Sequence, residues 1–353
     1  MSVEAASSEY DYGSHWISEQ LNSGVFGIEN PILVSVVKFG LVWDLLAAAY
    51  TVLRWSTMST PFLIASALGL LWVNLGPFLI WYYDERVLPR FFSRAHELLP
   101  SESERDHLAK KYTTFFSEHR LSVSLFWTLA TVLIVYASRD VLQAQGMVGS
   151  ARVFLWTTYL YALYIGSVLG HGFMGPVTTI LLVRELSELD LTIDPLHPDN
   201  LGGLSNVGYC AIRTTLLFST GSLFLPLLFR FVSRGASSVV IFGFTGVYIL
   251  TILASFVYPT VKVNRRAQEL RDRKLEELRQ EYAEVRAEMG DPGSGELGEL
   301  NRRLELQRVQ NAFDKFNSVR LYPMQIDILT RLAGSLVLPL LFLLLEFYLP
   351  ELL

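Results

Sequence analysis

The sequence predicts an all-α polytopic membrane protein with seven transmembrane helices, its N-terminus inside, and a cytoplasmic helical hairpin. Three observations predict this fold class. The 353 residues are 51% hydrophobic and 18% charged, with a mean hydropathy of +0.34, which is too apolar for a soluble chain of this length. Seven segments are apolar over most of the roughly 20 residues that cross about 30 Å of hydrocarbon. Finally, a long charged insert, 261–321, separates the last two segments.

The arrangement of basic residues predicts the orientation of the chain. The expected spans are Pro31–Leu53, Pro61–Tyr83, Leu121–Ala137, Phe154–Val183, Tyr209–Phe231, Val239–Val261 and Ile328–Leu349. With all seven, one side of the membrane carries 21 Lys and Arg and the other carries five, so the richer side is cytoplasmic. A six-span alternative omits the third and shortest segment and places the C-terminus inside. It would also put two basic regions on opposite sides, and is disfavoured.

Residues 1–30 form the expected cytoplasmic or interfacial N-terminal segment. They contain five acidic residues and no Lys or Arg, so they lack the basic leader of a signal peptide. Trp16, Ile17 and Leu21 have helical spacing, which favours an amphipathic helix on the inner membrane interface. A disordered acidic tail is the alternative.

A six-span bundle over 31–261 includes a cytoplasmic helix at 101–120. Ser101 and Glu104 have the spacing of a capping box at its start. In the fourth span, Gly166, Gly170, Gly172 and Gly175 precede Pro176, so we expect either a kink or the close approach of another helix. The single cysteine, Cys210, excludes an internal disulfide and is expected to pack against another helix.

The insert 262–321 predicts the hairpin, and 322–353 contain the seventh span. A Pro/Gly-rich stretch, 291–295, separates two helical patterns with coiled-coil spacing. The expected assembly residues are the apolar positions of the two stripes. They are Leu275, Leu278, Tyr282, Val285, Met289, Leu304, Val309, Phe313 and Phe316.

The connection between spans four and five holds the most distinctive local sequence. Asp190, Asp194, His197 and Asp199 could bind Zn or Mn through carboxylate and imidazole groups. A structured turn is the favoured interpretation, because prolines follow Asp194 and His197 and a glycine pair follows at 202–203. No metal is assigned to these residues.

The pattern His-Pro-Asp-x-x-Gly-Gly-Leu, residues 197–204, resembles a motif of uncharacterised prokaryotic multi-pass membrane proteins. This resemblance covers about ten residues and implies shared architecture. It implies no chemistry, because that family has no assigned activity.

Ionisable and amide side chains within the spans are costly and often mark function. The candidates are Lys38, Asp44, Asn74, His171 and Arg213. Structural pairing between helices is the favoured explanation for Lys38, Asp44 and Arg213, and an ion or proton path is the alternative. The motifs of common hydrolases, nucleotide-binding loops and dinucleotide-binding folds are missing from the sequence, so no enzyme activity and no cofactor is expected. A basic face for nucleic acid is also lacking.

The predicted layout is similar to that of insect chemoreceptor channels and gustatory-receptor-like proteins. In that family, cytoplasmic helices join four subunits and the last span lines a cation pore. The resemblance implies a homo-oligomeric, tetrameric ion channel in the cell membrane, with the lipid bilayer and an ion or small ligand as its partners. The pore-lining candidates are then Gly334, Ser335, Pro339 and Glu346. The family's terminal-span motif is not found in this sequence.

Two other functions remain open. One is a membrane scaffold or sensor that recruits a cytoplasmic partner through the hairpin. The other is a proton-coupled transporter that uses Lys38, Asp44 and His171, although the internal repeats of many transporters are not evident.

Overall fold

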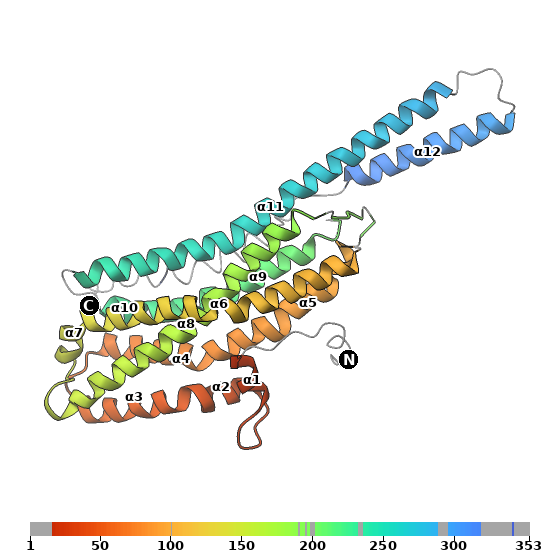
Figure 1. Cartoon of the computed structure of the whole chain (residues 1–353). Helices are drawn as coiled ribbons and strands as arrows, with labels where there is room; N and C mark the ends of the chain where they lie inside the picture. Colours follow the sequence, from red (N-terminus) through yellow and green to blue (C-terminus); the bar gives the residue numbers. More distant parts are fainter. Residues whose placement is uncertain are drawn as a thin grey trace.

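The computed structural model describes residues 16–99, 101–189, 191–194, 196–197, 202–231, 236–288, 296–318 and 341. Within these ranges the regular structure is helical, and no β-strand forms (Figure 1). Five helices among the described residues are long and apolar enough to cross a membrane. They are Pro31–Arg54, Thr60–Arg94, Gly149–Leu186, Ser205–Arg230 and Val239–Ala287. The chain is therefore a helical protein with the composition and helix lengths of a membrane protein.

The third and seventh expected spans are not among these five helices. Leu121–Ala137 is a shorter apolar stretch, and it forms the end of the 36-residue helix α6 (Glu102–Ala137). Ser101 caps this helix, accepting a hydrogen bond from the Glu104 backbone N–H at 3.4 Å, as the capping pattern predicts. The seventh expected span lies outside the described residues except for Leu341.

The N-terminal segment includes a short helix, α1 (Trp16–Asn22), so the helical interpretation holds for these residues. Ile17 and Leu21 are buried, whereas Trp16 remains exposed. The Trp81 indole N–H donates to Asn22 Oδ1 at 2.8 Å, which attaches α1 to α4 (Thr60–Tyr82). Residues 1–15 lie outside the described ranges.

The first long helix consists of α2 (Pro31–Ser35), a π-helical turn and α3 (Leu41–Arg54). Asn30 begins it by accepting from two backbone N–H groups, and Pro31 occupies the first turn, where its missing N–H costs nothing. The second long helix comprises α4 (Thr60–Tyr82), another π-helical turn and α5 (Leu88–Arg94). Insertions of this kind widen a helix locally and recur at functional sites.

Helices α6 and α8 (Arg152–Leu186) make the closest packing of the bundle through two glycines. A Cβ atom at Gly166 would lie 2.4 Å from the Thr128 Cα, and one at Gly170 would lie 2.4 Å from the Ser124 Cα. Because any side chain would collide with backbone, these positions require glycine. The close-approach interpretation is thus confirmed at both residues.

The remaining helices are α7 (Arg139–Ala144), α9 (Ser205–Ser219), α10 (Leu225–Arg230), α11 (Ala236–Glu288) and α12 (Glu296–Ser318). The 53 residues of α11 span about 80 Å, far more than a bilayer's hydrocarbon thickness. Its C-terminal part leaves the bundle, and α12 runs beside it (Figure 1). We call residues 271–288 of α11 together with α12 the rod.

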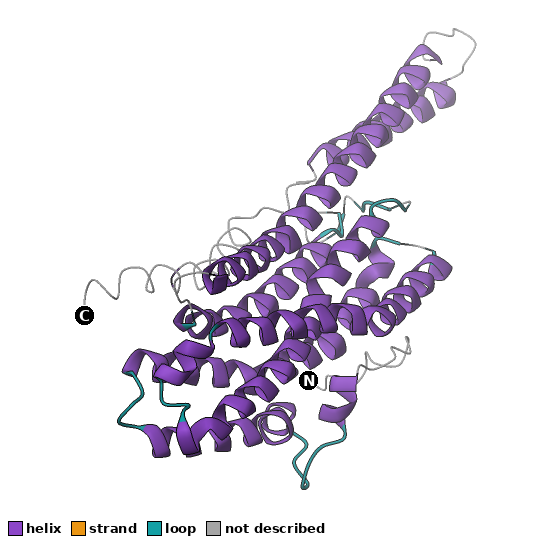
Figure 2. Cartoon of the chain, turned by 60° about the vertical axis from the view of Figure 1, so that its left-hand side comes forward, coloured by secondary structure: helices purple, strands orange, loops and turns teal. Residues whose placement is uncertain are grey.

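The helices of the bundle lie side by side (Figure 2), and the buried apolar residues between them form two clusters. The first includes residues of α4, α8 and α10, and the second includes residues of α5, α9 and the first half of α6. In the interior, the Thr179 hydroxyl lies 3.0 Å from both the Tyr83 and the Thr214 hydroxyls, which joins three helical segments by hydrogen bonds. Such bonds contribute to packing between membrane helices, where apolar contact alone gives little preference.

Candidate ligand cavity in the bundle

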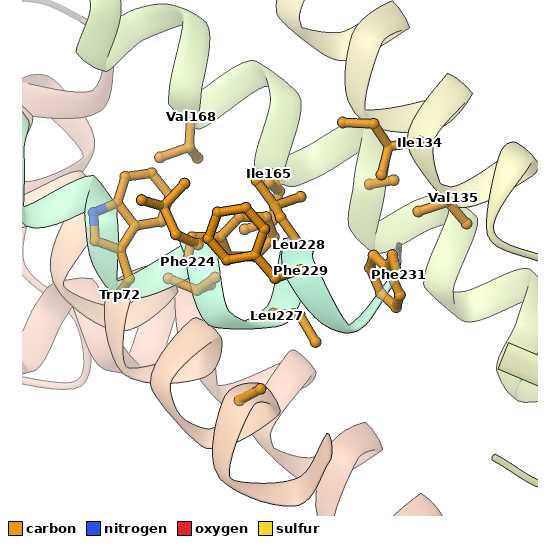
Figure 3. Packing of buried hydrophobic residues seen from close by; sticks show 14 of the residues in the cluster. Trp72, Ile134, Val135, Ile165, Val168, Phe224, Leu227, Leu228, Phe229 and Phe231 are labelled. Carbon is orange, nitrogen blue, oxygen red and sulfur yellow. The ribbon is translucent and has the colours of Figure 1, made fainter. Parts of the chain in front are cut away.

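A cavity of about 140 Å³ lies among α3, α4, α6, α8 and α10. Ile134 of α6, Ile165 of α8 and Leu228 of α10 are among its lining residues, and Figure 3 shows how these helices face one another around the buried cluster. This cavity is partly open at the surface of the bundle and is not an enclosed void. Its volume is comparable to that of an apolar cavity that binds benzene.

Aromatic rings hold much of the cavity wall in place. The Trp43 ring centroid lies 5.2 Å from that of Tyr161, and the Tyr50 centroid lies 5.0 Å from that of Phe154. The Tyr50 hydroxyl also donates to the Gln145 carbonyl at 2.7 Å, beside the helix ends. These contacts fix α3 against α8 and shape the space between them.

Hydroxyl groups interrupt the apolar wall, and most have partners within the protein. Thr131 donates to the Ala162 carbonyl at 2.8 Å, and Thr158 donates to the Phe154 carbonyl at 2.7 Å. The Tyr161 hydroxyl differs, because it is buried and has no hydrogen-bond partner among the described residues. A buried polar group without a partner is costly, so this hydroxyl is a candidate contact for a bound molecule.

Beside the cavity, Asp44 of α3 meets Asn74 of α4. The Asn74 amide nitrogen donates to both Asp44 carboxylate oxygens at 3.1 Å and to the Leu70 carbonyl at 3.0 Å. Both side chains are partly buried, and no cation pairs with Asp44 among the described residues. The carboxylate is therefore held by an amide of another helix.

The other intramembrane candidates lie elsewhere. Lys38 donates to the Gln20 carbonyl at 2.6 Å and to the Ser23 hydroxyl at 2.7 Å, at the end of α1. Lys38 and Asp44 thus use different partners. His171 lines a smaller cavity of about 50 Å³, with its Nδ1 2.7 Å from the Ser167 carbonyl oxygen. Arg213 lines a third cavity, at the start of α9.

The Asp/His loop has the features of a turn where it is described. The Asp194 carboxylate accepts from the Leu196 backbone N–H at 2.9 Å, and its carbonyl accepts from the His197 N–H at 3.1 Å. Gly202 has a φ of +68°, and a Cβ there would lie 2.3 Å from Ile193. No cluster of three metal-binding side chains occurs in the described ranges. Asp190 and Asp199 fall outside them.

The expected assembly residues divide between the inside and the surface of the rod. Four of them, Leu275, Leu278, Val285 and Val309, are buried where α11 packs against α12. Tyr282, Phe313 and Phe316 are half-buried, and Leu304 is 56% exposed. Arg308 pairs with Glu281, and Arg279 lies over the Phe313 ring, so the two helices are antiparallel. Met289 lies outside the described residues.

The pore candidates Gly334, Ser335, Pro339 and Glu346 lie outside the described residues. Conversely, the structure brings together cavity residues that the sequence did not single out, including Tyr50, Thr131 and Tyr161. Their periodicity is that of ordinary buried helix positions. Only the unusual number of aromatic hydroxyls at 159–164 could have drawn attention to this region.

Comparison with known proteins gives no relative for this chain. No protein-family model matches it, and no match of significance occurs among curated proteins or solved structures.

Proposed function

We propose that the protein is a membrane sensor. In this proposal its bundle binds a small lipophilic molecule carrying one polar group, and α11 transmits the occupied state to the rod on the cytoplasmic side. The observation that carries the proposal is Tyr161, which lines the apolar cavity and whose buried hydroxyl has no hydrogen-bond partner among the described residues.

The cavity suggests the chemical class of the ligand. Its lining includes Leu46, Ile134 and Leu227, which favour a hydrocarbon chain or ring, and its hydroxyls other than that of Tyr161 are largely occupied. A medium-chain alcohol or ketone would fill the space and accept a hydrogen bond from Tyr161. Pockets with apolar walls and few directed polar groups are typical of small-molecule sites.

Contacts between the cavity walls and α11 support its role in transmission. Trp127 lies one turn from Thr131 on α6, and its ring centroid is 4.8 Å from that of Phe244 on α11. On α10, the Phe229 ring centroid lies 6.3 Å from that of Phe242. Helix α11 continues from these contacts into the rod without a break. A ligand that moved α6 or α10 would therefore act directly on the helix that leaves the bundle.

Photolabelling of the purified full chain tests the ligand site. The probe is a short alkyl alcohol carrying a diazirine, and labelled peptides are identified by mass spectrometry. We expect labelling of α3, α4 and α8 in the wild type and its reduction by Ala47→Leu, which fills the cavity. Ala48→Leu is the matched control, because Ala48 is exposed on the outside of the same helix.

The polar contact has a separate test. An unlabelled alcohol or alkane can compete with the diazirine probe and so reduce labelling. Tyr161→Phe should weaken competition by the alcohol but leave competition by the corresponding alkane unchanged. Equal labelling of wild type, Ala47→Leu and Ala48→Leu would reject the cavity as a ligand site.

The proposal includes seven spans, an internal N-terminus, a cytoplasmic rod and assembly into a homo-oligomer in the cell membrane.

Deletion of residues 275–316 separates two possible roles of the rod, self-assembly and recruitment of another protein. Loss of the oligomer would indicate self-assembly, whereas loss of a bound protein from an intact oligomer would indicate recruitment. Ion flux through liposomes containing the wild type would extend the proposal to a ligand-gated channel, and absence of flux with ligand bound would limit it to a sensor.

A further inference from the structure

Three arginines line the third cavity, which has a volume of about 240 Å³ and lies between α5 and α9. Arg90 and Arg94 are spaced four residues apart, which places them on one face of α5. Arg213 of α9 completes the set, and Asn206 and Tyr209 also line the cavity. The Asn206 amide donates to the Phe91 carbonyl at 2.9 Å, holding the two helices together at this point.

The positive charge of this cavity is not neutralised by the described part of the chain. None of the three guanidinium groups forms an ion pair or a hydrogen bond with another described residue. Like charges that surround a common space repel one another, and this repulsion is strongest where access of water is reduced. An anion in the cavity would remove this cost and accept hydrogen bonds from the guanidinium groups.

If the hydrocarbon begins near Thr60, the length of the second long helix would place this cavity at the level of the lipid headgroups. From Thr60 to Arg90 the helix rises about 46 Å, which exceeds the hydrocarbon thickness of about 30 Å. Arg213 lies two turns inside α9, and Tyr209 is 47% exposed beside it. Tyrosine is enriched where a membrane helix meets the headgroup region. A phosphate at this depth could reach all three arginines.

We propose that Arg90, Arg94 and Arg213 form a binding site for a phosphate group. The guanidinium plane pairs with two phosphate oxygens at once, which favours phosphate over a halide. The phosphate can belong to an anionic phospholipid or to a soluble phosphate ion. The exposed Tyr209 and the depth of the site favour the lipid, whose chains would lie along α9.

Native mass spectrometry of the full chain, released from detergent, tests this site. Phosphatidylglycerol and phosphatidylcholine are titrated separately, and inorganic phosphate is added as a competitor. We expect tighter binding of phosphatidylglycerol by the wild type and weakening of about tenfold in Arg94→Gln and Arg213→Gln. Arg139→Gln is the matched control, because this exposed arginine lies on α7, away from the cavity.

The outcomes separate the two sources of phosphate. Displacement of the lipid by millimolar inorganic phosphate, with the same loss in both variants, would assign the site to soluble phosphate. Arg94 is exposed, so Arg94→Gln gives a result even where Arg213→Gln disturbs folding. Equal binding of both lipids by the wild type without phosphate binding, or unchanged affinity in Arg94→Gln, would overturn the proposal.

Discussion

The two larger cavities of the bundle differ in what their walls offer. The cavity beside α3 presents aliphatic and aromatic groups and Tyr161, whose hydroxyl has no partner in the described part of the chain, whereas the cavity between α5 and α9 presents three cationic side chains. A void with apolar walls stays dry and favours hydrocarbon, and one with cationic walls attracts anions. The two cavities of one bundle therefore differ in the class of molecule that each would accept. Substitutions that disturb one cavity and spare the other test this division.

The largest effect is expected where α6 and α8 touch. Gly170→Ala places a methyl group 2.4 Å from the Ser124 Cα, so α6 and α8 must separate, and both helices line the apolar cavity. We expect a loss of about 2 to 3 kcal/mol in the free energy of unfolding, measured by thermal denaturation in detergent. Gly172→Ala is the control, because no atom lies within 4 Å of its added Cβ. Equal melting temperatures for the two variants would contradict the close packing.

A somewhat smaller effect is expected beside the apolar cavity. Asn74→Ala removes the amide that holds the Asp44 carboxylate, and should cost about 2 kcal/mol of stability. Alkyl probe labelling should fall, while phosphatidylglycerol binding stays unchanged. The double variant Asp44→Leu with Asn74→Leu should recover part of the stability, because it leaves neither polar group unpaired. If the double variant is less stable than Asn74→Ala, the Asp44 carboxylate has another partner.

The Tyr112 hydroxyl of α6 donates a hydrogen bond to the Glu185 carboxylate of α8 at 2.7 Å. Burial, together with this carboxylate, raises the pKa of the Tyr112 hydroxyl above its usual value of 10.0. The protonated hydroxyl therefore stabilises the folded state below that value, and this contribution is lost as pH rises through the folded-state pKa. Tyr112→Phe should cost about 1 kcal/mol at neutral pH. The difference between wild type and variant should shrink in melting curves recorded above pH ~10. A difference in stability between wild type and Tyr112→Phe that stays constant with pH would exclude this dependence of stability on the protonation of Tyr112.

The smallest effect is expected in the rod, which contacts neither cavity. Arg308 and Glu281 pair across its two helices with largely exposed side chains. Exposed ion pairs contribute about 0 to 1 kcal/mol, so Arg308→Ala should leave the melting temperature of the bundle almost unchanged. It should also leave probe and lipid binding at wild-type levels. A large change in either binding assay would show that the rod and the bundle are strongly coupled.

Hydropathy and helix-capping patterns predicted the long helices because both depend on residues near one another in sequence. The glycines of the fourth apolar helix were predictable for the same reason, although only the structure identifies Thr128 and Ser124 as the residues opposite. For Asp44, the sequence indicated a partner on another helix and could not select Asn74. That choice depends on how α3 rotates against α4, which no local pattern encodes.

The candidate sites were less predictable than the fold. Arg90 and Arg94 share a helix face by their spacing, but the approach of Arg213 follows from tertiary packing. The apolar cavity is formed by several helices, each contributing residues that resemble ordinary core positions. A cavity is an absence of atoms between such residues, so composition and periodicity do not reveal it.

The unbroken course of α11 has a mechanical consequence. About 40 Å of this helix, from Val261 to Glu288, lies beyond its apolar part. A stiff helix pivoting at the membrane surface acts as a lever arm. A tilt of about 5° would then move its tip by about 3.5 Å, given its length at 1.5 Å per residue. Small displacements against Phe242 and Phe244 would thus be magnified where α12 pairs with the far end of α11.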